Sequence, residues 1–324
     1  MEAKWLEDFL SVARTGNFSQ SAGEMHITQS AFSRRIKTLE QWVGVALIDR
    51  STYPTRLTPA GERFRDAARD ATAALLKTRQ DLRQALNADR RLLRIAIQHS
   101  LAASFLVPWL TRLRMAARVS LACDDLLVRA IADNLHDCVR ELEEGSADFL
   151  VCYTQPELPL HLDATRYPSM ALADDALVAV SRPDAAGQAL HAVRFDMAAA
   201  VPWLAYSEGT FLSRAASLAL QRPGQVPSLK PVFESALAEA LRAGAVAGLG
   251  VAWLPHSLAA DDLERGVLVR AGGPEFDVGL QICLYAERSA AESRLKRLWQ
   301  AAQALADAGS VAPGQAFVNH DLSA

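Results

Sequence analysis

The stretch that decides the fold is NFSQSAGEMHITQSAFSRRIKTLEQWVGVALIDR, residues 17–50. Its pattern predicts two helices joined by a short turn. Ser19 is placed to cap the first helix, which runs to about residue 25, because a hydroxyl at a helix start accepts an unpaired backbone N–H. Thr28 is placed in the same way before a second helix over residues 29–42. The sequence therefore predicts a helix-turn-helix.

The second predicted helix has two different faces. Its apolar residues recur every three or four positions, and they form an inward stripe of Ala31, Phe32, Ile36, Leu39 and Val43. The opposite face has short hydrogen-bonding side chains first and cations further along. A helix that enters the DNA major groove needs this order, since its first residues reach base edges while its cations and N-terminal amides hold phosphate. The alternative is an ordinary solvated helix that carries Arg34 and Arg35, and the flanking segments favour DNA.

The flanking segments complete a winged DNA-binding unit. Before the two helices, an apolar stripe can pack behind them, formed by Trp5, Leu6, Phe9, Leu10, Val12 and Ala13. After them, VGVALIDR and STYPTRLTPAG (residues 43–61) fit a strand, a turn and a second strand, with Thr58 placed to cap the next helix. The predicted DNA contacts are Ser19, Gln20, Thr28, Gln29, Ser30, Ser33, Arg34, Arg35, Lys37, Arg50, Thr52 and Arg56.

This segment resembles the winged helix-turn-helix of the LysR-type transcriptional regulators. The resemblance covers nearly the whole chain, strongly to about residue 95 and more loosely beyond. Two small departures are Ile48, where many members have Phe, and Ser30, where many have Pro. The matching residues are Phe9, Leu10, Gly16, Asn17, Phe18, Ala22, Thr28, Gln29, Ser30, Ala31, Ser33, Arg34, Ile36, Leu39, Glu40, Gly44, Leu47, Arg50, Leu57, Thr58, Ala60 and Gly61.

The composition is that of a globular chain with mixed charge. Half of its 324 residues are hydrophobic and the formal net charge is -3. A chain of this length can bury two or three cores. Residues 28–56 hold five basic and two acidic side chains, a local excess of three. We therefore expect specific DNA binding to depend on dimer geometry and base contacts more than on net charge.

Targeting and metal-binding signals are not visible in the sequence. The N-terminus MEAKWLEDFL lacks a basic run followed by a long apolar stretch, so we expect a cytoplasmic protein. The longest apolar runs, such as residues 236–254, are interrupted by charges and glycines, which argues against a membrane span. Cys123, Cys138, Cys152 and Cys283 show no zinc-binding spacing. Reduced thiols and no metal or other cofactor are therefore expected.

A long helix is predicted after the wing, over residues 58–89. It carries one apolar seam, formed by Phe64, Ala67, Ala71, Leu75, Thr78, Leu82 and Leu86. A single seam suits a two-helix interface. The alternative is that the seam packs on its own domain. The resembling family dimerises through a helix at this place. The resemblance therefore implies a homodimer or homotetramer that presents two recognition helices about one turn of DNA apart.

From residue 91 strands and helices alternate, which predicts a parallel sheet. The expected strands are LLRIAIQ, RVSLACDD, ADFLVCYT, ALVAVS, VPWLAYS, SLKPVFES, GLGVAWLP and DVGLQICLYAE, with helices over residues 126–145 and 291–306. The resemblance implies two α/β lobes like those of a periplasmic solute-binding protein. The expected fold class is thus α + α/β, with a winged helix-turn-helix (1–60), a linker and dimerisation helix (61–90), an effector-binding domain (91–308; lobe 1 about 91–163 plus 269–308, lobe 2 about 164–268) and a loose tail (309–324).

Ligands of an open parallel sheet collect beyond the carboxyl ends of its strands. The polar residues predicted there, as effector-binding residues, are His99, Ser100, Tyr153, Thr154, Ser207, Thr210, Glu234 and Ser235. Several precede a helix, where hydroxyls and amides can hold an anion. Glu234, if it points inward, favours a cation or a neutral ligand instead. The alternative is that the hydroxyls are ordinary helix caps and that His99 is satisfied structurally.

The stretches KWLEDFL, NFSQ, AFSRRIKTLEQ and IAIQHSLA resemble, more narrowly, a branch of the family that contains a hypochlorite-responsive regulator. This resemblance implies an oxidant as one candidate signal. Met115, Met170 and Met197, along with the four cysteines, are oxidisable, and the alternative is that they only fill the core. The predicted protein is a transcription regulator whose partners are double-stranded DNA, a small-molecule effector or oxidant, a second copy of itself and RNA polymerase.

Two other functions are compatible with the α/β half, an enzyme and a solute-binding protein. The sequence has no GxSxG elbow, P-loop, GxGxxG fingerprint or HExxH motif. A solute-binding protein needs a signal peptide, and the DNA-binding unit at the N-terminus also opposes it. The regulator is therefore the leading interpretation.

Overall fold

The computed structural model describes residues 2–25, 27–51, 54–86, 92–117, 127–160, 162–195, 199–220, 227–288 and 295–309. The chain forms two compact units, Met1–Ala88 and Asp89–Ala324. In the described ranges, no helix has both the length and the apolar character that crossing a membrane requires.

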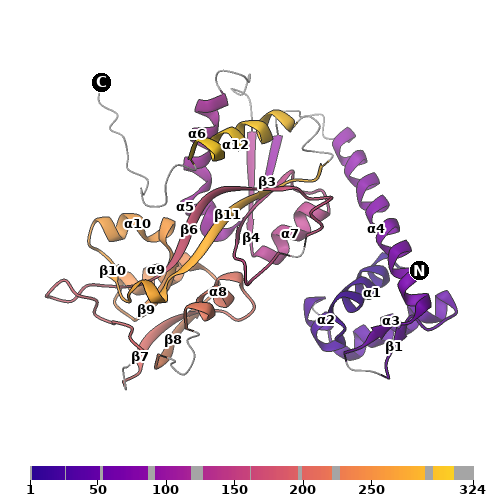
Figure 1. Ribbon diagram of the computed structural model, residues 1–324, viewed down its shortest axis with the longest axis horizontal. Helices are drawn as coiled ribbons and strands as arrows, with labels where there is room; N and C mark the ends of the chain where they lie inside the picture. The colour runs from indigo at the N-terminus through magenta and orange to yellow at the C-terminus, as the bar shows by residue number, and fades with distance from the viewer. Residues whose placement is uncertain are drawn as a thin grey trace. The chain divides into compact units, whose positions relative to one another are not determined.

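The first unit consists of helices around one core and a short two-stranded wing (Figure 1). The inward stripe predicted for the second helix is confirmed, because Phe32, Ile36 and Leu39 are fully buried. The wing is antiparallel, with Ile48 opposite Leu57. The elements are α1 (Ala3–Thr15), α2 (Phe18–Glu24), α3 (Gln29–Val43), β1 (Ile48–Asp49), β2 (Arg56–Leu57) and α4 (Pro59–Leu86).

Two of the three predicted helix caps are confirmed and one is wrong. The Thr28 hydroxyl accepts the Ala31 amide at 3.3 Å, and the Thr58 hydroxyl accepts the Gly61 amide at 3.0 Å. Ser19 does not cap α2. Its amide instead donates to the side chain of Asn17 at 2.9 Å, because the extended backbone before the helix is at Asn17.

The linker helix α4 packs on its own unit at its start and leaves it further on. The Phe64 ring packs edge-on against Phe9, with centroids 5.3 Å apart, and Ala68 is buried. Leu75, further along the predicted seam, is 60% exposed. The side chains of Leu82 and Leu86 lie outside the described residues. The start of the seam thus packs on its own unit, and the two-helix interface stays a prediction for the part around Leu75.

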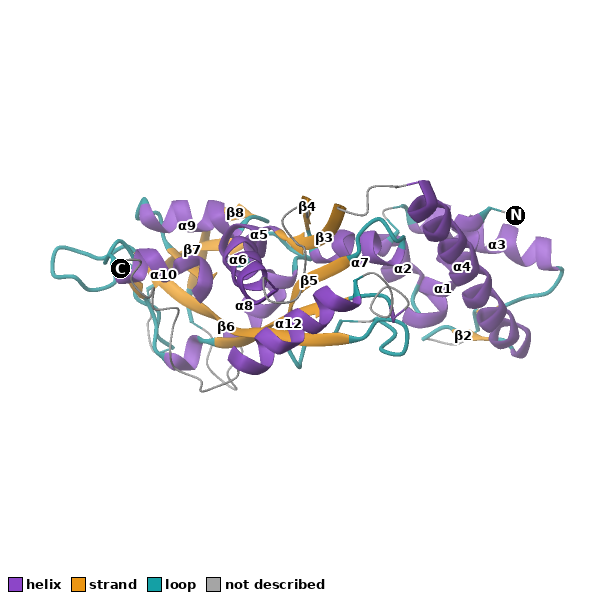
Figure 2. Cartoon of the chain, turned by 90° about the horizontal axis from the view of Figure 1, so that it is seen from above, coloured by secondary structure: helices purple, strands orange, loops and turns teal. Residues whose placement is uncertain are grey.

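The second unit is built on one mixed sheet that serves two α/β lobes (Figure 2). In its described residues the strand order is β4-β3-β5-β11-β6-β9-β7-β8, with β10 paired to β6. The strands are β3 (Leu92–Gln98), β4 (Leu127–Asp133), β5 (Phe149–Thr154), β6 (Ser169–Ser181), β7 (Val201–Tyr206), β8 (Leu229–Ser235), β9 (Val251–Pro255), β10 (Val269–Arg270) and β11 (Val278–Tyr285).

The expected parallel sheet is only partly right. Strand β3 is parallel to β4 and β5, and β7 is parallel to β8 and β9. The two parallel groups are joined by β6 and β11, which pair antiparallel to each other. The sequence pattern reflects the strand-and-helix alternation within each lobe. Strands β6 and β11 carry the chain from one lobe to the other. Their antiparallel direction cannot be predicted from the alternation of strands and helices.

Helices cover the sheet in each lobe (Figures 1 and 2). A single apolar cluster extends through both lobes and includes Ile97 of β3, Leu204 of β7 and Trp253 of β9. The helices are α5 (His99–Ser104), α6 (Leu106–Ala117), α7 (Leu135–Glu143), α8 (Phe211–Leu220), α9 (Ala238–Val246), α10 (His256–Glu264) and α12 (Lys296–Gly309), with a 3-10 turn at Pro274–Phe276.

One predicted helix is wrong. The sequence pattern predicts a single helix over residues 126–145, but Leu127–Asp133 is strand β4 and the helix starts only at Leu135. Strand β4 is the edge of the sheet and is mostly exposed, so it lacks the apolar alternation that marks a half-buried strand. The expected strand RVSLACDD and the tail after Gly309 lie outside the described residues.

Candidate functional site

Helix α3 carries six of the twelve predicted DNA contacts. The hydroxyl of Ser19 donates to the Gln29 side chain at 3.1 Å, which ties α2 to the start of α3. Within the described part of the chain, the charged ends of Arg34 and Lys37 form no hydrogen bond or ion pair. Both cations are therefore free to contact phosphate or a base edge. The exposed members of the predicted set are Ser19, Gln20, Thr28, Gln29, Ser30, Arg34, Lys37, Arg50 and Arg56, and Ser33 is half-buried.

Two members of the predicted set differ from the others. The Arg35 guanidinium faces α1, where its Nη1 lies 3.4 Å from Oδ2 of the buried Asp8. Burial raises the pKa of Asp8, and the nearby cations Arg35 and Lys4 oppose that rise. Thr52 lies outside the described residues. Arg35 thus has a partner inside its own unit, whereas Arg34 has none among the described residues.

Sequence reasoning missed two residues that contact the wing arginine. Arg50 Nη2 donates to Glu40 Oε2 at 3.1 Å, and the guanidinium carbon lies 5.2 Å from the centre of the Phe18 ring. Both partners belong to the helix-turn-helix, Glu40 to α3 and Phe18 to α2. Their chemistry gave no separate signal, because a Glu and a Phe at helical spacing are common in any amphipathic helix.

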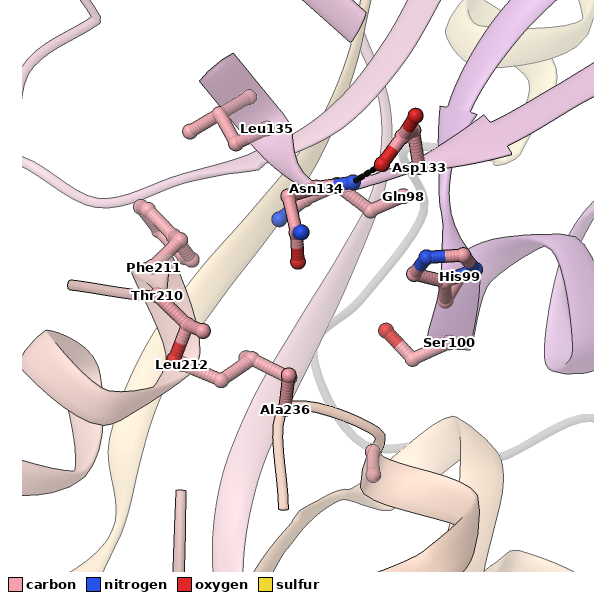
Figure 3. Close-up of a pocket in the computed structure, with 11 residues that line it drawn as sticks. Gln98, His99, Ser100, Asp133, Asn134, Leu135, Thr210, Phe211, Leu212 and Ala236 are labelled. Carbon is pink, nitrogen blue, oxygen red and sulfur yellow. Dashed lines mark hydrogen bonds between the residues drawn. The ribbon is translucent and has the colours of Figure 1, made fainter. Parts of the chain in front are cut away.

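A small polar pocket lies between the two lobes (Figure 3). It encloses about 30 Å³, which is room for about one water molecule. Figure 3 shows His99 and Ser100 on one side and Thr210 on the other. The lining residues are Gln98, His99, Ser100, Asp133, Asn134, Leu135, Thr210, Phe211, Leu212, Ala236 and Ala238.

The pocket brings together three of the eight predicted effector residues, His99, Ser100 and Thr210. It also contains Asp133 and Asn134, which fall inside a helix by the sequence pattern alone. The Asp133 carboxylate accepts the Asn134 amide at 2.8 Å. In the described ranges, no group of three or more His, Cys, Asp or Glu side chains is arranged to hold a metal ion. The pocket therefore suits a small polar ligand held by hydroxyl, amide and carboxylate groups.

Two neighbours on β5 point to opposite faces of the sheet. Tyr153 is fully buried, and its hydroxyl donates to Asp175 at 3.2 Å. The Thr154 hydroxyl lies 3.3 Å from the Cys283 sulfur. Thr154, Asp174 and Cys283 belong to a second, open pocket of about 640 Å³. Neither Tyr153 nor Thr154 lines the interlobe pocket.

Two of the remaining predicted effector residues, Ser207 and Ser235, hold local structure. Ser207 accepts the Thr210 hydroxyl at 3.0 Å through its carbonyl, and the Ser235 hydroxyl accepts the Leu237 amide at 3.1 Å. Glu234 is exposed on β8 and does not line the interlobe pocket. The condition under which Glu234 would oppose an anion is therefore not met, and the carboxylate in the pocket belongs to Asp133.

Known proteins match both units of the chain. The profile described as bacterial regulatory helix-turn-helix protein, lysR family, matches residues 3–62, and that of the LysR substrate binding domain matches residues 87–307. The chain is 30% identical over 302 residues to the HTH-type transcriptional regulator YjiE of Escherichia coli strain K12, with 93% of each protein covered.

Similar solved structures extend over nearly the full chain. Vibrio fischeri DarR in complex with DNA is 28% identical, with a TM-score of 0.55 and coverage of 94% of this chain and 99% of DarR. Full-length HypT of Salmonella typhimurium, described as a hypochlorite-specific LysR-type transcriptional regulator, is 26% identical, with a TM-score of 0.54 and coverage of 95% and 99%. The chain belongs to the LysR family and is a DNA-binding transcription regulator with a two-lobed effector-binding domain.

Proposed function

We propose that the chain reads its operator with α3 and receives its signal in the pocket between the lobes. The observation that carries the first part is the exposed polar face of α3, from which Arg34 and Lys37 project without partners among the described residues. Gln29 and Ser30 at the helix start are suited to base edges, and Arg34 to guanine or phosphate. The other exposed members of the predicted set, including Arg50 and Arg56 of the wing, would hold the DNA backbone.

The dimer is the second part of the proposal. Leu75 is 60% exposed on α4, beyond the part of the helix that packs on its own unit. An apolar seam that leaves its own domain gains stability when a second copy covers it. A homodimer, or a homotetramer built from two of them, would place recognition helices about one turn of DNA apart.

The effector pocket is the third part. It lies where β3 and β4 end at their carboxyl ends, the place where α/β sheets usually bind ligands. Because it encloses only about 30 Å³, we infer a ligand no larger than a small polar ion. The lobes, about 91–163 plus 269–308 and about 164–268, would move about β6 and β11. A ligand shifts this balance only if it binds one arrangement more tightly than the other.

An oxidant is a second candidate signal. HypT is described as hypochlorite-specific, and Met115 here is 65% exposed at the end of α6. Oxidation would convert its apolar thioether into a polar sulfoxide. Met170 is half-buried on β6, and Met197 lies outside the described residues. The regulator would act in the cytoplasm together with RNA polymerase.

The pocket is tested by Ser100→Ala in the full chain. A panel of small polar ions and acids, with hypochlorite as a separate arm, is screened for a rise in the melting temperature of the wild-type protein. We expect a hit that loses its effect in Ser100→Ala but keeps it in Ser217→Ala, a matched change on the exposed side of α8. A hit that raises the melting temperature of both variants equally would place the site elsewhere.

A further inference from the structure

Arg50 is held in place although it lies on the surface of the wing. It follows β1 directly, and 42% of its side chain is exposed. An exposed arginine usually samples many rotamers, and holding it in one of them costs side-chain entropy. Here two side chains from different helices meet its guanidinium.

The first contact is Glu40, near the end of α3. One carboxylate oxygen, Oε1, accepts the backbone amides of Leu47 and Ile48 at 2.9 and 3.1 Å. The other, Oε2, accepts Arg50 Nη2 at 3.1 Å. The Glu40 side chain is only 14% exposed. A single carboxylate therefore fixes both the start of the wing and the arginine that follows its first strand.

The second contact is the ring of Phe18, at the start of α2. The Arg50 guanidinium lies over this ring at 5.2 Å, in a cation–π arrangement. The Phe18 ring in turn packs edge-on against Phe32 of α3, with centroids 5.8 Å apart. Two sets of contacts thus fix the position of Arg50 relative to α3. One is the hydrogen bond to Glu40, and the other runs through Phe18 to Phe32.

The contacts leave most of the guanidinium available. A guanidinium has five N–H donors, and Glu40 takes one of those on Nη2. The others can donate to phosphate oxygens, for which the planar fork is well suited. A cation already held in its bound orientation loses less entropy on binding than a free one.

We propose that Glu40 is a positioning residue for DNA binding: with the Phe18 ring it fixes the Arg50 guanidinium relative to α3, so that Arg50 binds a backbone phosphate and sets the register in which α3 enters the groove. This inference rests on the proposed function of α3. It differs from a purely structural role for Glu40, in which the carboxylate would only hold the two wing amides.

The two roles are separated by a double-mutant cycle on the full chain. Glu40→Gln, Arg50→Gln and the double variant are compared with wild type by fluorescence anisotropy, with a DNA duplex enriched by the wild-type chain from a random library. We expect Arg50→Gln to weaken binding about tenfold and to lower the slope of log affinity against log salt by about one, as for a lost phosphate contact. Glu40→Gln should weaken binding about fivefold in the wild type and less than about twofold when Arg50 is absent.

Controls keep the outcome interpretable. Glu62→Gln removes the same charge from the Arg65–Glu62 pair of the same unit, and should not weaken binding. Melting temperatures check folding, and Phe18→Leu, which leaves Glu40 intact, should show the same coupling to Arg50→Gln if Glu40→Gln is unstable. Additive losses, with Glu40→Gln equally damaging in both backgrounds, would overturn the positioning role.

The test also distinguishes the two proposals. A phosphate contact carries no sequence information, so the cycle can be run on any duplex that the wild type binds. A wild type without sequence preference but with coupled losses would contradict the proposed operator reading and keep the role of Glu40. A wild type with a sequence preference but additive losses would support the proposed operator reading and contradict the positioning role of Glu40.

Discussion

The Ser257 hydroxyl donates to the carboxylate of Asp175 at 2.6 Å, and the Ser257 amide donates to the other oxygen of the same group at 3.2 Å. Asp175 lies on the joining strand β6, and Ser257 in the first turn of α10. A carboxylate at a helix start is favoured by the unpaired amides and the helix dipole. The Tyr153 hydroxyl is a further donor to Asp175. Asp175 thus connects β5, β6 and α10 within the second unit.

Removal of the Ser257 hydroxyl should lower the stability of the protein. We expect Ser257→Ala to lower the free energy of unfolding by about 2 kcal/mol, because a hydrogen bond to a charged group is lost. Ser217→Ala, at an exposed hydroxyl, should change it by less than about 0.5 kcal/mol. Urea unfolding of the full chain measures both. Equal effects of the two variants would mean that the contact with Asp175 is not stabilising.

The buried pair of Asp8 and Arg35 should respond unequally to loss of each partner. Arg35→Ala leaves the Asp8 carboxylate buried without its nearest cation, and should cost about 2 kcal/mol. Asp8→Asn removes the charge and keeps a polar partner, so it should cost less than about 1 kcal/mol or even stabilise. Urea unfolding at pH 7 compares them, and a larger loss for Asp8→Asn would contradict this ranking.

The same pair sets a pH dependence. Burial raises the pKa of Asp8 above its ordinary value of 3.8, so the folded state binds this proton more tightly than the unfolded chain. Stability is then lost as the pH rises from the unfolded pKa through the folded one. The advantage of Asp8→Asn over wild type should therefore grow with pH in this window. An advantage that shrinks with rising pH would mean that the nearby cations outweigh burial and hold the pKa of Asp8 below its ordinary value.

Two glycines of the first unit should respond oppositely to alanine. A Cβ on Gly61, in the first turn of α4, would overlap the carbonyl oxygen of Leu47, so Gly61→Ala should cost about 3 kcal/mol through overpacking. Gly23 in α2 has no neighbour within 4 Å of such a Cβ. Gly23→Ala should therefore stabilise by about 0.5–1 kcal/mol through helix propensity. Thermal unfolding measures the melting temperatures of both variants. Equal shifts of the two melting temperatures would contradict this prediction.

The helix-turn-helix is largely predictable because its signals are local. The positions of Phe32, Ile36 and Leu39 repeat with the helical period, and Thr28 and Thr58 cap the helices that follow them. The sequence pattern favours Ser19 as a cap where Asn17 is one, since either residue type can cap a helix. The difference depends on where the extended backbone turns helical, which a residue pattern gives only to within a few positions.

The effector half is less predictable because its contacts are distant in sequence. Tyr153 and Thr154 are neighbours on β5, yet successive side chains of a strand face opposite sides, and the pattern does not tell which side meets the ligand. Asp175, the partner of Tyr153, lies 22 residues further along the chain. Asp133 escapes prediction because the exposed edge strand β4 has the residue pattern of a helix. Residue type thus identifies candidate effector-binding residues, but the sequence only partly predicts which of them line the interlobe pocket.

The central claim, that α3 reads DNA sequence, is tested by Arg34→Ala. Fluorescence anisotropy compares the DNA upstream of this protein's own gene with scrambled DNA, with Arg69→Ala on α4 as a control of equal charge. We predict that wild type and Arg69→Ala prefer the upstream DNA, and that Arg34→Ala loses about 1–3 kcal/mol of specific binding without loss of folding. Specific binding by Arg34→Ala within about twofold of wild type would contradict the claim.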